Sequence, residues 1–546
     1  MSTKRLKLIS IVLVVFIMIS AVGCTTSTKV DSDTGDSKSS NVSETNDKTS
    51  ARDNKTPAAN EEPMTLNWTG AEYGPVNEDA PIKKFFEEKF NVKFNLTYVE
   101  ASKYEEIMNL RFASNDIPDV FNAKNVTMLT TWANQDLLAE VSEQTLRKYA
   151  PNIAKEIDSY KKFDQKVWEY SKVNGKSYGI LYHNADLVYP SPVIWRDDWL
   201  KNVGINKIPE TIDEFETALY KFAKEDPDKN GKDDTYGLSS DGMNAIYGTS
   251  GYWPSFWNKS GDGVVWGGIQ PEMKEVLRLL NKWYKDGVID PEFVTGENQG
   301  GYWAISHSFS NGRIGMTARA SYYHWNPPYY EGALGGSNYQ SFYSIQPETA
   351  TYAFGRPAIG KDGKTGMSIG GVIAQFTVFG YHLDEETEKL AKILEILDTL
   401  ASDYDLYLIA KFGFEGEHWD YSKEKEPVPR EEYKEASAAA TIGLSNCFVI
   451  WQSMDFYRKT RPYHFEFAEK VVNYERYVNE VPIGLPSTAK YKADLDKLQE
   501  QTYLKLITGD LPIDAFDDFV TQWLQLGGEQ LTKEANDWYK SATAGN

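Results

Sequence analysis

Residues 92–99 read Val92-Lys93-Phe94-Asn95-Leu96-Thr97-Tyr98-Val99, and their alternation of apolar and polar side chains predicts a strand with one buried face. On the N-terminal side, residues 80–90 have apolar side chains at helical spacing, and residues 66–68 suit a short strand. On the C-terminal side, residues 104–113 predict a helix and residues 118–121 a strand. This order of strands and helices predicts an α/β fold with a mainly parallel sheet.

The end of the third expected strand is a candidate ligand site. In open α/β sheets, ligands bind beyond the carboxyl ends of the strands. Residues 119–124 lie at such an end, and they include the polar side chains of Asn122 and Lys124. These two residues are therefore candidates for ligand contact.

The chain is too long for one hydrophobic core, so two lobes are expected. Residues 63–190 are assigned to the first part of an N-terminal α/β lobe, and residues 191–370 to a second lobe. Residues 371–546 would hold the return crossing, the remainder of both lobes and C-terminal helices. Further elements are expected as helices at 213–224 and 271–285, a strand at 371–379, one long helix at 384–411, and a helix that Asp514 caps and that ends at Trp523.

The N-terminus has the features of a bacterial secretion signal. Three cations precede an apolar run at residues 8–22, and Cys24 directly follows Ala21-Val22-Gly23. This arrangement resembles the lipobox of lipoproteins, in which the cysteine becomes lipidated after residues 1–23 are removed. Residues 24–62 are then a polar, disordered tether, because they have almost no apolar side chains to bury. The expected location is the extracellular face of a bacterial, Gram-positive membrane; an ordinary secreted protein is the alternative.

The mature chain is strongly acidic. The full sequence has a net charge of −21, and removing residues 1–23 takes away three cations, which leaves 55 cations against 79 anions and a charge of −24. This charge argues against nucleic acid as a partner and against direct adsorption to anionic lipid. Cys447 would have no disulfide partner once Cys24 is lipidated, and its apolar surroundings predict a small buried side chain.

Residues 226–234 form the sharpest motif, Asp226-Pro227-Asp228-Lys229-Asn230-Gly231-Lys232-Asp233-Asp234. Side-chain oxygens at loop positions 1, 3, 5 and 9, a glycine at 6 and the Lys232 carbonyl at 7 suit calcium, which prefers several hard oxygen ligands. Position 12 is Gly237 where an EF-hand has glutamate, so Asp233, Thr235, a distant side chain or water must complete the shell. A solvated acidic turn and a calcium-switched sensor are the alternatives to a structural ion.

Several stretches, taken in their order along the chain, resemble a known family. It is the carbohydrate-specific extracellular solute-binding lipoproteins of ABC importers, in the branch that includes alginate-oligosaccharide-binding proteins. The stretches are residues 113–120, 174–180, 195–200, 283–293, 413–419 and 511–517. The resemblance implies a two-lobed, hinged, monomeric receptor that closes on an oligosaccharide, delivers it to ABC permease subunits and performs no catalysis. It also implies a structural calcium held by Asp226, Asp228, Asn230, Asp234 and the Lys232 carbonyl, with Thr235 where some relatives have glutamate.

Sugar recognition needs aromatic platforms and planar polar side chains. Trp257 and Trp325 are the favoured platforms, because they lie among Gly, Ser, Asn and Pro, although burial in the core is an equal alternative for each. By resemblance, residues 451–457 match a cleft-lining stretch. The full candidate set is Trp68, Asn122, Lys124, Tyr182, Trp257, His324, Trp325, Trp451, Gln452 and Tyr457. Few cations lie near residues 451–457, which favours a neutral oligosaccharide.

Two other classes of function fit the composition. A secreted glycosidase would need two carboxylates flanking the scissile bond, and pairs such as Glu415 and Glu417 arise freely among 79 acidic residues. The sequence has no Gly-x-Ser-x-Gly, His-Glu-x-x-His or phosphate-loop motif. A polysaccharide-binding surface lipoprotein without a transporter is the other alternative.

Overall fold

The computed structural model describes residues 62–544, except residues 184–188, 330–332, 369–372, 424, 445–446, 450 and 452. The expected signal peptide, Cys24 and all but the last residue of the expected tether lie outside the described residues, as does the candidate Gln452. The fold below concerns the described part of the chain.

The first sheet has five strands in the order β2-β1-β3-β14-β6. These are β1 (Met64–Ala71), β2 (Val92–Tyr98), β3 (Val120–Ala123), β6 (Ile180–His183) and β14 (Ile373–Phe379). β1 runs parallel to β2 and β3, with Trp68 opposite Leu96 and Val120, whereas β14 is antiparallel to β3 and β6. The carboxyl ends of β1, β3 and β6 therefore meet at one edge of the sheet.

The alternation at residues 92–99 forms the predicted strand. Val92 and Phe94 of β2 are buried while Lys93 and Asn95 are exposed. The two flanking helices also form as predicted, as α1 (Pro81–Phe90) and α2 (Tyr104–Ala113). Asn91 ends α1 in the left-handed conformation, with φ 52°, which turns the chain directly into β2.

The second sheet has four strands in the order β12-β7-β11-β8. They are β7 (Val193–Arg196), β8 (Tyr236–Leu238), β11 (Ile314–Thr317) and β12 (Tyr352–Gly355). β11 pairs in parallel with β8 and antiparallel with β7. Two-stranded sheets are β4 (Lys172–Val173) with β5 (Lys176–Ser177), β9 (Trp257–Ser260) with β10 (Gly263–Trp266), β13 (Met367–Ser368) with β17 (Arg476–Tyr477), and β15 (Trp419–Tyr421) with β16 (Pro427–Pro429).

Helices cover both sheets, and those predicted at residues 213–224 and 271–285 lie where apolar periodicity placed them. The helices after α2 are α3 (Val126–Asn134), α4 (Glu143–Tyr149), α5 (Pro151–Ser159), α6 (Asp197–Asn202), α7 (Ile212–Lys224), α8 (Asn244–Tyr247), α9 (Pro271–Lys285), α10 (His307–Ser310), α11 (Ser337–Ile345), α12 (Thr387–Ser402), α13 (Tyr404–Phe412), α14 (Ala436–Thr441), α15 (Met454–Thr460), α16 (Pro462–Val471), α17 (Thr488–Thr508), α18 (Ala515–Trp523) and α19 (Glu529–Thr543). α7 begins with a capping box between Thr211 and Glu214.

Two predicted helix features are wrong. The single helix expected at residues 384–411 is two helices, because Asp403 leaves the helical conformation after α12 and its carboxylate accepts the Leu406 N–H at the start of α13. Asp514 precedes α18 but makes no capping hydrogen bond. Its carboxylate instead pairs with Lys274 at 3.2 Å, so an ion pair to α9 replaces the expected cap.

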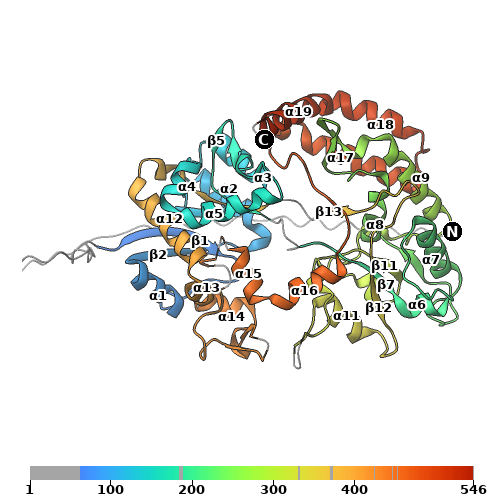
Figure 1. Cartoon of the computed structure of the whole chain (residues 1–546), viewed down its shortest axis with the longest axis horizontal. Coiled ribbons are helices and arrows are strands. Elements are labelled where there is room, and N and C mark those ends of the chain that lie inside the picture. Colours follow the sequence, from blue (N-terminus) through green and yellow to red (C-terminus); the bar gives the residue numbers. More distant parts are fainter. Residues whose placement is uncertain are drawn as a thin grey trace, which may run out of the picture. The chain divides into compact units, whose positions relative to one another are not determined.

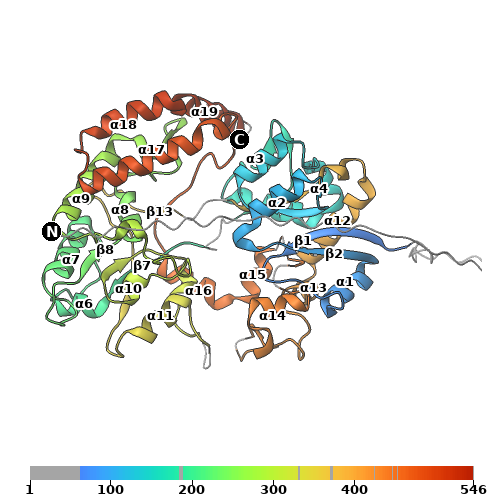
Figure 2. The ribbon, with the colours of Figure 1, turned by 180° about the vertical axis from the view of Figure 1, so that it is seen from behind.

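Buried apolar side chains of the described chain form two large cores, one around each main sheet (Figure 1). The first contains strands β1 to β3 together with α12, α13 and α15; the second contains α7, α9 and the C-terminal helices α17 to α19. A small third core surrounds Trp325 and Phe342. The two groups of elements are equally distinct from behind (Figure 2), and the fold is a two-lobed α/β fold.

The chain passes between the two large cores three times. Membership of the cores changes between Tyr182 and Val193, between Met367 and Phe376, and inside α16 between Phe465 and Ala468. The lobe limits proposed at 190 and 370 fall within the first two intervals. The third crossing, through a helix that lies between the two groups of elements in both views, was not foreseen at a particular residue.

Candidate ligand-binding site

Two cavities, one of about 370 Å³ and one of about 240 Å³, are lined by predicted ligand residues. The smaller one opens at the carboxyl edge of the first sheet. Glu72 follows β1, Lys124 follows β3, and Tyr182 lies near the end of β6. Gln375 enters from the start of the antiparallel strand β14. Parallel strands thus bring polar residues that are distant in sequence to one edge.

Helices complete this smaller cavity with two more cations. Lys411 lies at the end of α13, and Arg461 lies between α15 and α16. The Arg461 guanidinium donates to the Tyr457 hydroxyl at 3.2 Å, and its carbon lies 5.1 Å from the centre of the Tyr457 ring. We call this cavity the basic pocket; its described lining residues are Glu72, Asn122, Lys124, Tyr182, Tyr189, Gln375, Lys411, Val449, Tyr457 and Arg461.

Charge and hydrogen bonding in the basic pocket are unevenly balanced. Lys124 pairs with Glu72, and its ammonium lies 4.8 Å from the centre of the Tyr104 ring. Burial, with a smaller contribution from Arg461, lowers the pKa of Lys411 to about 8. The Asn122 side chain is only 3 % exposed, and its Oδ1 has no hydrogen-bond partner among the described residues. A buried amide oxygen of this kind can accept a hydrogen bond from a ligand hydroxyl.

Aromatic side chains of the second lobe lie beside the pocket. Tyr302 and Trp303 are 52 % and 54 % exposed, and the Trp303 ring lies 5.2 Å from that of His324, almost perpendicular to it. His324 contacts Tyr323 with ring centres 4.3 Å apart. Tyr323 in turn lies 6.2 Å from Tyr189, which lines the basic pocket. We call Tyr302, Trp303, Tyr323 and His324 the aromatic face.

Tyr73 links the aromatic face to the first lobe. It follows Glu72 and is 47 % exposed. The pKa of its hydroxyl is raised by partial burial, then by the negative charge of Glu72 and by Tyr302. Tyr302 must therefore lie close to the residues that follow β1. Exposed aromatic side chains from both lobes, Tyr73 and Tyr302, therefore interact electrostatically beside Glu72 of the basic pocket.

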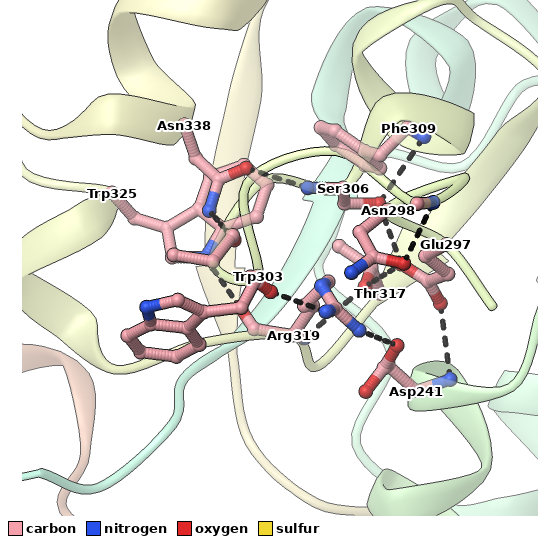
Figure 3. Close-up of polar contacts among 12 residues, drawn as sticks. Asp241, Glu297, Asn298, Trp303, Ser306, Phe309, Thr317, Arg319, Trp325 and Asn338 are labelled. Atoms are coloured by element: carbon pink, nitrogen blue, oxygen red, sulfur yellow. Dashed lines mark hydrogen bonds and ion pairs between the residues drawn. The ribbon is translucent and has the colours of Figure 1, made fainter. Parts of the chain in front are cut away.

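A buried carboxylate holds the loop that carries Tyr302 and Trp303 (Figure 3). Glu297 is fully buried and accepts hydrogen bonds from the Ser306 hydroxyl at 2.5 Å, the Thr317 hydroxyl at 2.6 Å and the Asp241 N–H at 3.1 Å. Burial and the nearby Asp241 raise the pKa of Glu297 to about 8. Arg319 pairs with Asp241 at 2.6 Å and donates to the Trp303 carbonyl, so both ends of the loop are fixed.

The predicted ligand residues fall into separate places. Asn122, Lys124, Tyr182 and Tyr457 line the basic pocket together, and His324 belongs to the aromatic face. Trp257 lines the larger cavity, beside Asn125 of the first lobe and Lys492 of the second. Trp451 is 4 % exposed, and its indole donates to the Leu181 carbonyl at 3.0 Å, directly behind the strand that carries Tyr182.

Two of the candidate ligand residues, Trp68 and the favoured platform Trp325, are corrected to core residues. Trp68 has no exposed surface and packs edge-on against Phe94 at 5.7 Å. Trp325 is also fully buried, against Phe309, with its indole donating to the Arg319 carbonyl at 2.7 Å. Neither indole offers a face to a ligand, because the strand and loop positions that hold them point into the cores.

Other pocket residues were missed. Glu72, Lys411 and Arg461 were not singled out from the sequence, nor were Tyr302 and Trp303. A signal for Arg461 existed, because the cations in Arg458-Lys459-Thr460-Arg461 begin one residue beyond the 451–457 stretch in which they were counted. Tyr302-Trp303 follows Gly300-Gly301, and glycine was among the neighbouring residue types that favoured Trp257.

The acidic loop at residues 226–234 gathers three carboxylates around one amide. The Asn230 backbone N–H donates to Asp226 at 3.1 Å, and its side-chain amide donates to Asp228 at 2.8 Å and to Asp234 at 3.1 Å. Burial, and then the neighbouring Asp226 and Asp234, raise the pKa of Asp228. These hard oxygen donors suit a divalent cation. Among the described residues, however, no three acidic, histidine or cysteine side chains have the arrangement needed to hold a metal ion.

The details of the acidic loop limit which residues would hold an ion. Asn230 presents its amide nitrogen to the carboxylates, while its Oδ1 accepts the Lys232 N–H at 2.8 Å. Ion binding would require the amide oxygen to turn inward. Thr235 is 4 % exposed, and its hydroxyl donates to the Phe222 carbonyl at 2.8 Å. Thr235 is thus engaged with α7, which weighs against the expectation that it completes the shell.

Residues 73–353, a little over half of the chain, match the family described as bacterial extracellular solute-binding protein. The chain belongs to this family. Two curated relatives from Bacillus subtilis (strain 168) cover most of it: Lipoprotein LipO is 25 % identical over 85 % of this chain and 90 % of its own length, and the polygalacturonan/rhamnogalacturonan-binding protein YtcQ is 24 % identical over 88 % and 92 %.

Solved structures confirm the two-lobed fold that the resemblance implied. The alginate-binding protein AlgQ2, crystallised without calcium ion, superposes with a TM-score of 0.61 at 18 % identity, covering 88 % of this chain and 99 % of that one. An EF-hand mutant of the Streptococcus pneumoniae substrate-binding protein FusA, in complex with fructo-nystose, gives 0.63 at 15 %, covering 88 % and 100 %. Among the described residues of this extracellular solute-binding protein, none of the helices is long and apolar enough to span a membrane.

Proposed function

We propose that this solute-binding protein captures an oligosaccharide outside the cell and delivers it to the permease of an ABC importer, without chemical conversion. The observation that carries the proposal is the pairing of a polar pocket at the edge of the first sheet with an exposed aromatic face from the second lobe. Sugars need both, because each ring has an apolar face and a rim of hydroxyls. YtcQ is named as a polygalacturonan/rhamnogalacturonan-binding protein, and FusA as the substrate-binding protein of a fructooligosaccharide transporter. Both names support the same class of ligand.

Closure of the two lobes supplies the transport signal in this proposal. A ligand that contacts Asn122 in the first lobe and Trp303 in the second binds the closed form better than the open one, so it raises the closed population. The three chain crossings between the cores are the segments that would bend. The permease would then recognise the closed shape.

Two experiments test the function. A glycan array followed by calorimetry on the tagged mature chain should find at least one oligosaccharide that binds, and small-angle scattering should show compaction when it is saturating. If broad neutral and acidic glycan sets all fail to bind, the proposal is wrong. Incubation of the bound oligosaccharide with the protein should leave its length unchanged; shortened products would favour a glycosidase.

The acidic loop is proposed to hold a structural calcium ion through Asp226, Asp228, Asn230, Asp234 and the Lys232 carbonyl. The ion would neutralise the clustered carboxylates and tie the end of α7 to β8. One FusA structure is that of an EF-hand mutant, and the AlgQ2 structure is described as lacking calcium ion. Both descriptions support a metal site in relatives. Thr235 is left out, because its hydroxyl already bonds to α7.

Cys24 is proposed to carry the lipid that anchors a monomeric receptor at the extracellular face of the membrane. The name Lipoprotein LipO supports an anchor of this kind. Intact mass measurement of membrane-extracted protein tests it: the expected species begins at Cys24 and carries added acyl mass. A water-soluble species that retains an unmodified Cys24 would contradict it.

A further inference from the structure

The charge of the basic pocket opposes the charge of the protein. The whole sequence carries a net charge of −21. Nevertheless, the described lining residues of this pocket comprise the three cations Lys124, Lys411 and Arg461 and the single carboxylate of Glu72. One cation is paired with Glu72. The lining therefore has two more positive than negative charges, concentrated in about 240 Å³.

Arg461 is positioned to meet an anion. The residue as a whole is partly exposed and lines the pocket, and its guanidinium contacts the hydroxyl and ring of Tyr457. Tyr457 contributes most to raising the pKa of Arg461, burial opposes this effect, and further tyrosines add to the increase. A guanidinium donates through a planar fork that matches the two oxygens of a carboxylate. Tyrosine hydroxyls leave most of that donor capacity unused.

Lys411 is a second cation of the pocket that an anionic ligand group would stabilise. It and Arg461 both line the pocket and are close enough for Arg461 to help burial lower the pKa of Lys411 to about 8. Two neighbouring cations in a desolvated site destabilise each other, and an anion placed between them would relieve this repulsion. The pocket thus gains most from an anionic ligand group.

Neighbouring groups indicate that the anion is part of a sugar. Asn122 presents a buried, unpartnered amide oxygen, which is an acceptor and suits a ligand hydroxyl, not a second anion. Tyr189 joins the pocket to Tyr323 and the exposed ring of Trp303. A ligand in the pocket therefore has cations and a hydroxyl acceptor around it, and ring contacts through Tyr323 and His324 connect the pocket to an exposed aromatic surface.

We propose that the basic pocket binds the carboxylate of a uronate unit within an oligosaccharide, with Arg461 as its principal contact and the aromatic face stacking a neighbouring sugar unit. This proposal rests on the proposed capture of oligosaccharides and narrows it to acidic ones. It also corrects the expectation of a neutral sugar, which came from a cation count that ended before Arg461.

The test compares acidic oligosaccharides with their neutral counterparts on the mature chain. Trimers of galacturonate, mannuronate and guluronate are titrated by calorimetry beside the same trimers with their carboxylates reduced to alcohols. At least one uronate trimer is expected to bind about tenfold to a hundredfold more tightly than its reduced form. Equal or tighter binding of the reduced form would overturn the proposal but keep the proposed function. Failure of all trimers, acidic and neutral, and of a broad glycan array would overturn both.

Variants locate the contact. Arg461→Gln is expected to lower uronate affinity to the level of the reduced trimer while leaving affinity for the reduced trimer within about twofold. Arg278→Gln is the matched control, because Arg278 is exposed on α9 and pairs with Glu275. Glu72→Gln, which removes the one carboxylate of the lining, should strengthen uronate binding. An equal loss for acidic and neutral trimers in Arg461→Gln would refute the assigned contact.

A second arm separates a sugar carboxylate from a simple anion. Inorganic phosphate and free galacturonic acid are titrated under the same conditions. The proposal expects phosphate to bind at least about tenfold more weakly than the trimer, because it cannot use the aromatic face. Phosphate binding as tight as that of the trimer would make the pocket a phosphate site and overturn the assignment to sugar.

Discussion

The acidic loop and the basic pocket are built in opposite ways. The loop takes all its donors from nine consecutive residues. The lining of the pocket instead comes from three strand ends, the start of a fourth strand, two helices and connecting segments, between residues 72 and 461. One is a local turn that clusters negative charge, and the other is a tertiary assembly that clusters positive charge. Local spacing therefore reveals the first but not the second.

The two regions are also expected to serve different ends. The loop lies between α7 and β8 of the second lobe, away from the residues that line the pocket, so an ion there should act on stability. The pocket holds the Asn122 amide oxygen, which is buried without a partner among the described residues at a cost in folding free energy, and so the pocket should act on recognition. An effect of the loop on ligand binding, or of the pocket on stability, would contradict this assignment of roles.

Calcium removal should give the largest effect on the loop side of this comparison. At a concentration one hundredfold above its dissociation constant, calcium should stabilise the folded chain by about 2.7 kcal/mol, because it binds the folded form alone. Thermal melts with excess calcium and with chelator measure this. Asp228→Asn should abolish the difference, whereas Asp262→Asn, a carboxylate in the turn between β9 and β10, should keep it.

The same melts can contradict the comparison. An unchanged melting temperature after exhaustive chelation would remove the ion from the acidic loop. A loss of oligosaccharide binding on chelation, measured at a temperature where the chain remains folded, would mean that the loop takes part in recognition. Either result would mean that the acidic loop does not act on stability alone while the basic pocket acts on recognition.

Much of the first lobe was predictable from local pattern. The alternation at Val92 and Phe94 set both the strand and its buried face, since one face of β2 had to meet the core. The long helix failed at Asp403, whose side chain competes for backbone N–H groups and so restarts the helix. Such competition depends on the neighbouring turn, which apolar periodicity does not report.

The candidate site was predictable only in part. Asn122 and Lys124 were found because strand ends in parallel sheets are a general place for ligands. Arg461 and Lys411 join them through packing of α13 and α15 against the first sheet, and no short-range pattern encodes that contact. Trp68 and Trp325 show the converse failure, since indole burial depends on what packs over it.

Trp303→Ala should give the next largest effect, on the pocket side of the comparison. Loss of an exposed stacking surface should weaken acidic and reduced trimers alike by about 0.5–1.5 kcal/mol, or about twofold to tenfold. Calorimetry measures the affinity, and the melting temperature should change little because the Trp303 side chain is exposed. Phe163→Ala is the matched control, since Phe163 is 50 % exposed in the first lobe and lies outside the pocket lining.

The outcome of that substitution shows whether Trp303 supplies stacking surface to any sugar or takes part in recognising the carboxylate. If Trp303→Ala weakened only the acidic trimer, the aromatic face would share in charge recognition, and the division between pocket and face would fail. If neither trimer were affected, the aromatic face would lie outside the bound ligand, and only the basic pocket would remain as the site.

The pH dependence of uronate binding should give the smallest effect and bears on the pocket alone. The pKa of Lys411 lies below the ordinary value for lysine, so the side chain is a cation below about pH 8 and loses its proton as the pH rises through that value. The attraction to a carboxylate is then present at low pH and lost at high pH. Affinity for the acidic trimer should fall by about twofold to fivefold from about pH 7 to about pH 9.5.

Several other titratable groups line the same pocket, so the fall must be assigned to Lys411 by substitution. They are Glu72, Lys124, Tyr182, Tyr189, Tyr457 and Arg461. Lys411→Arg keeps the charge across this range and should give a flat profile, and the reduced trimer should be flat with both proteins. A fall of equal size in Lys411→Arg would place the titrating group elsewhere. Because bound carboxylate favours the protonated form, proton uptake on binding near pH 8, read from calorimetry in two buffers, should accompany the fall and be absent in Lys411→Arg.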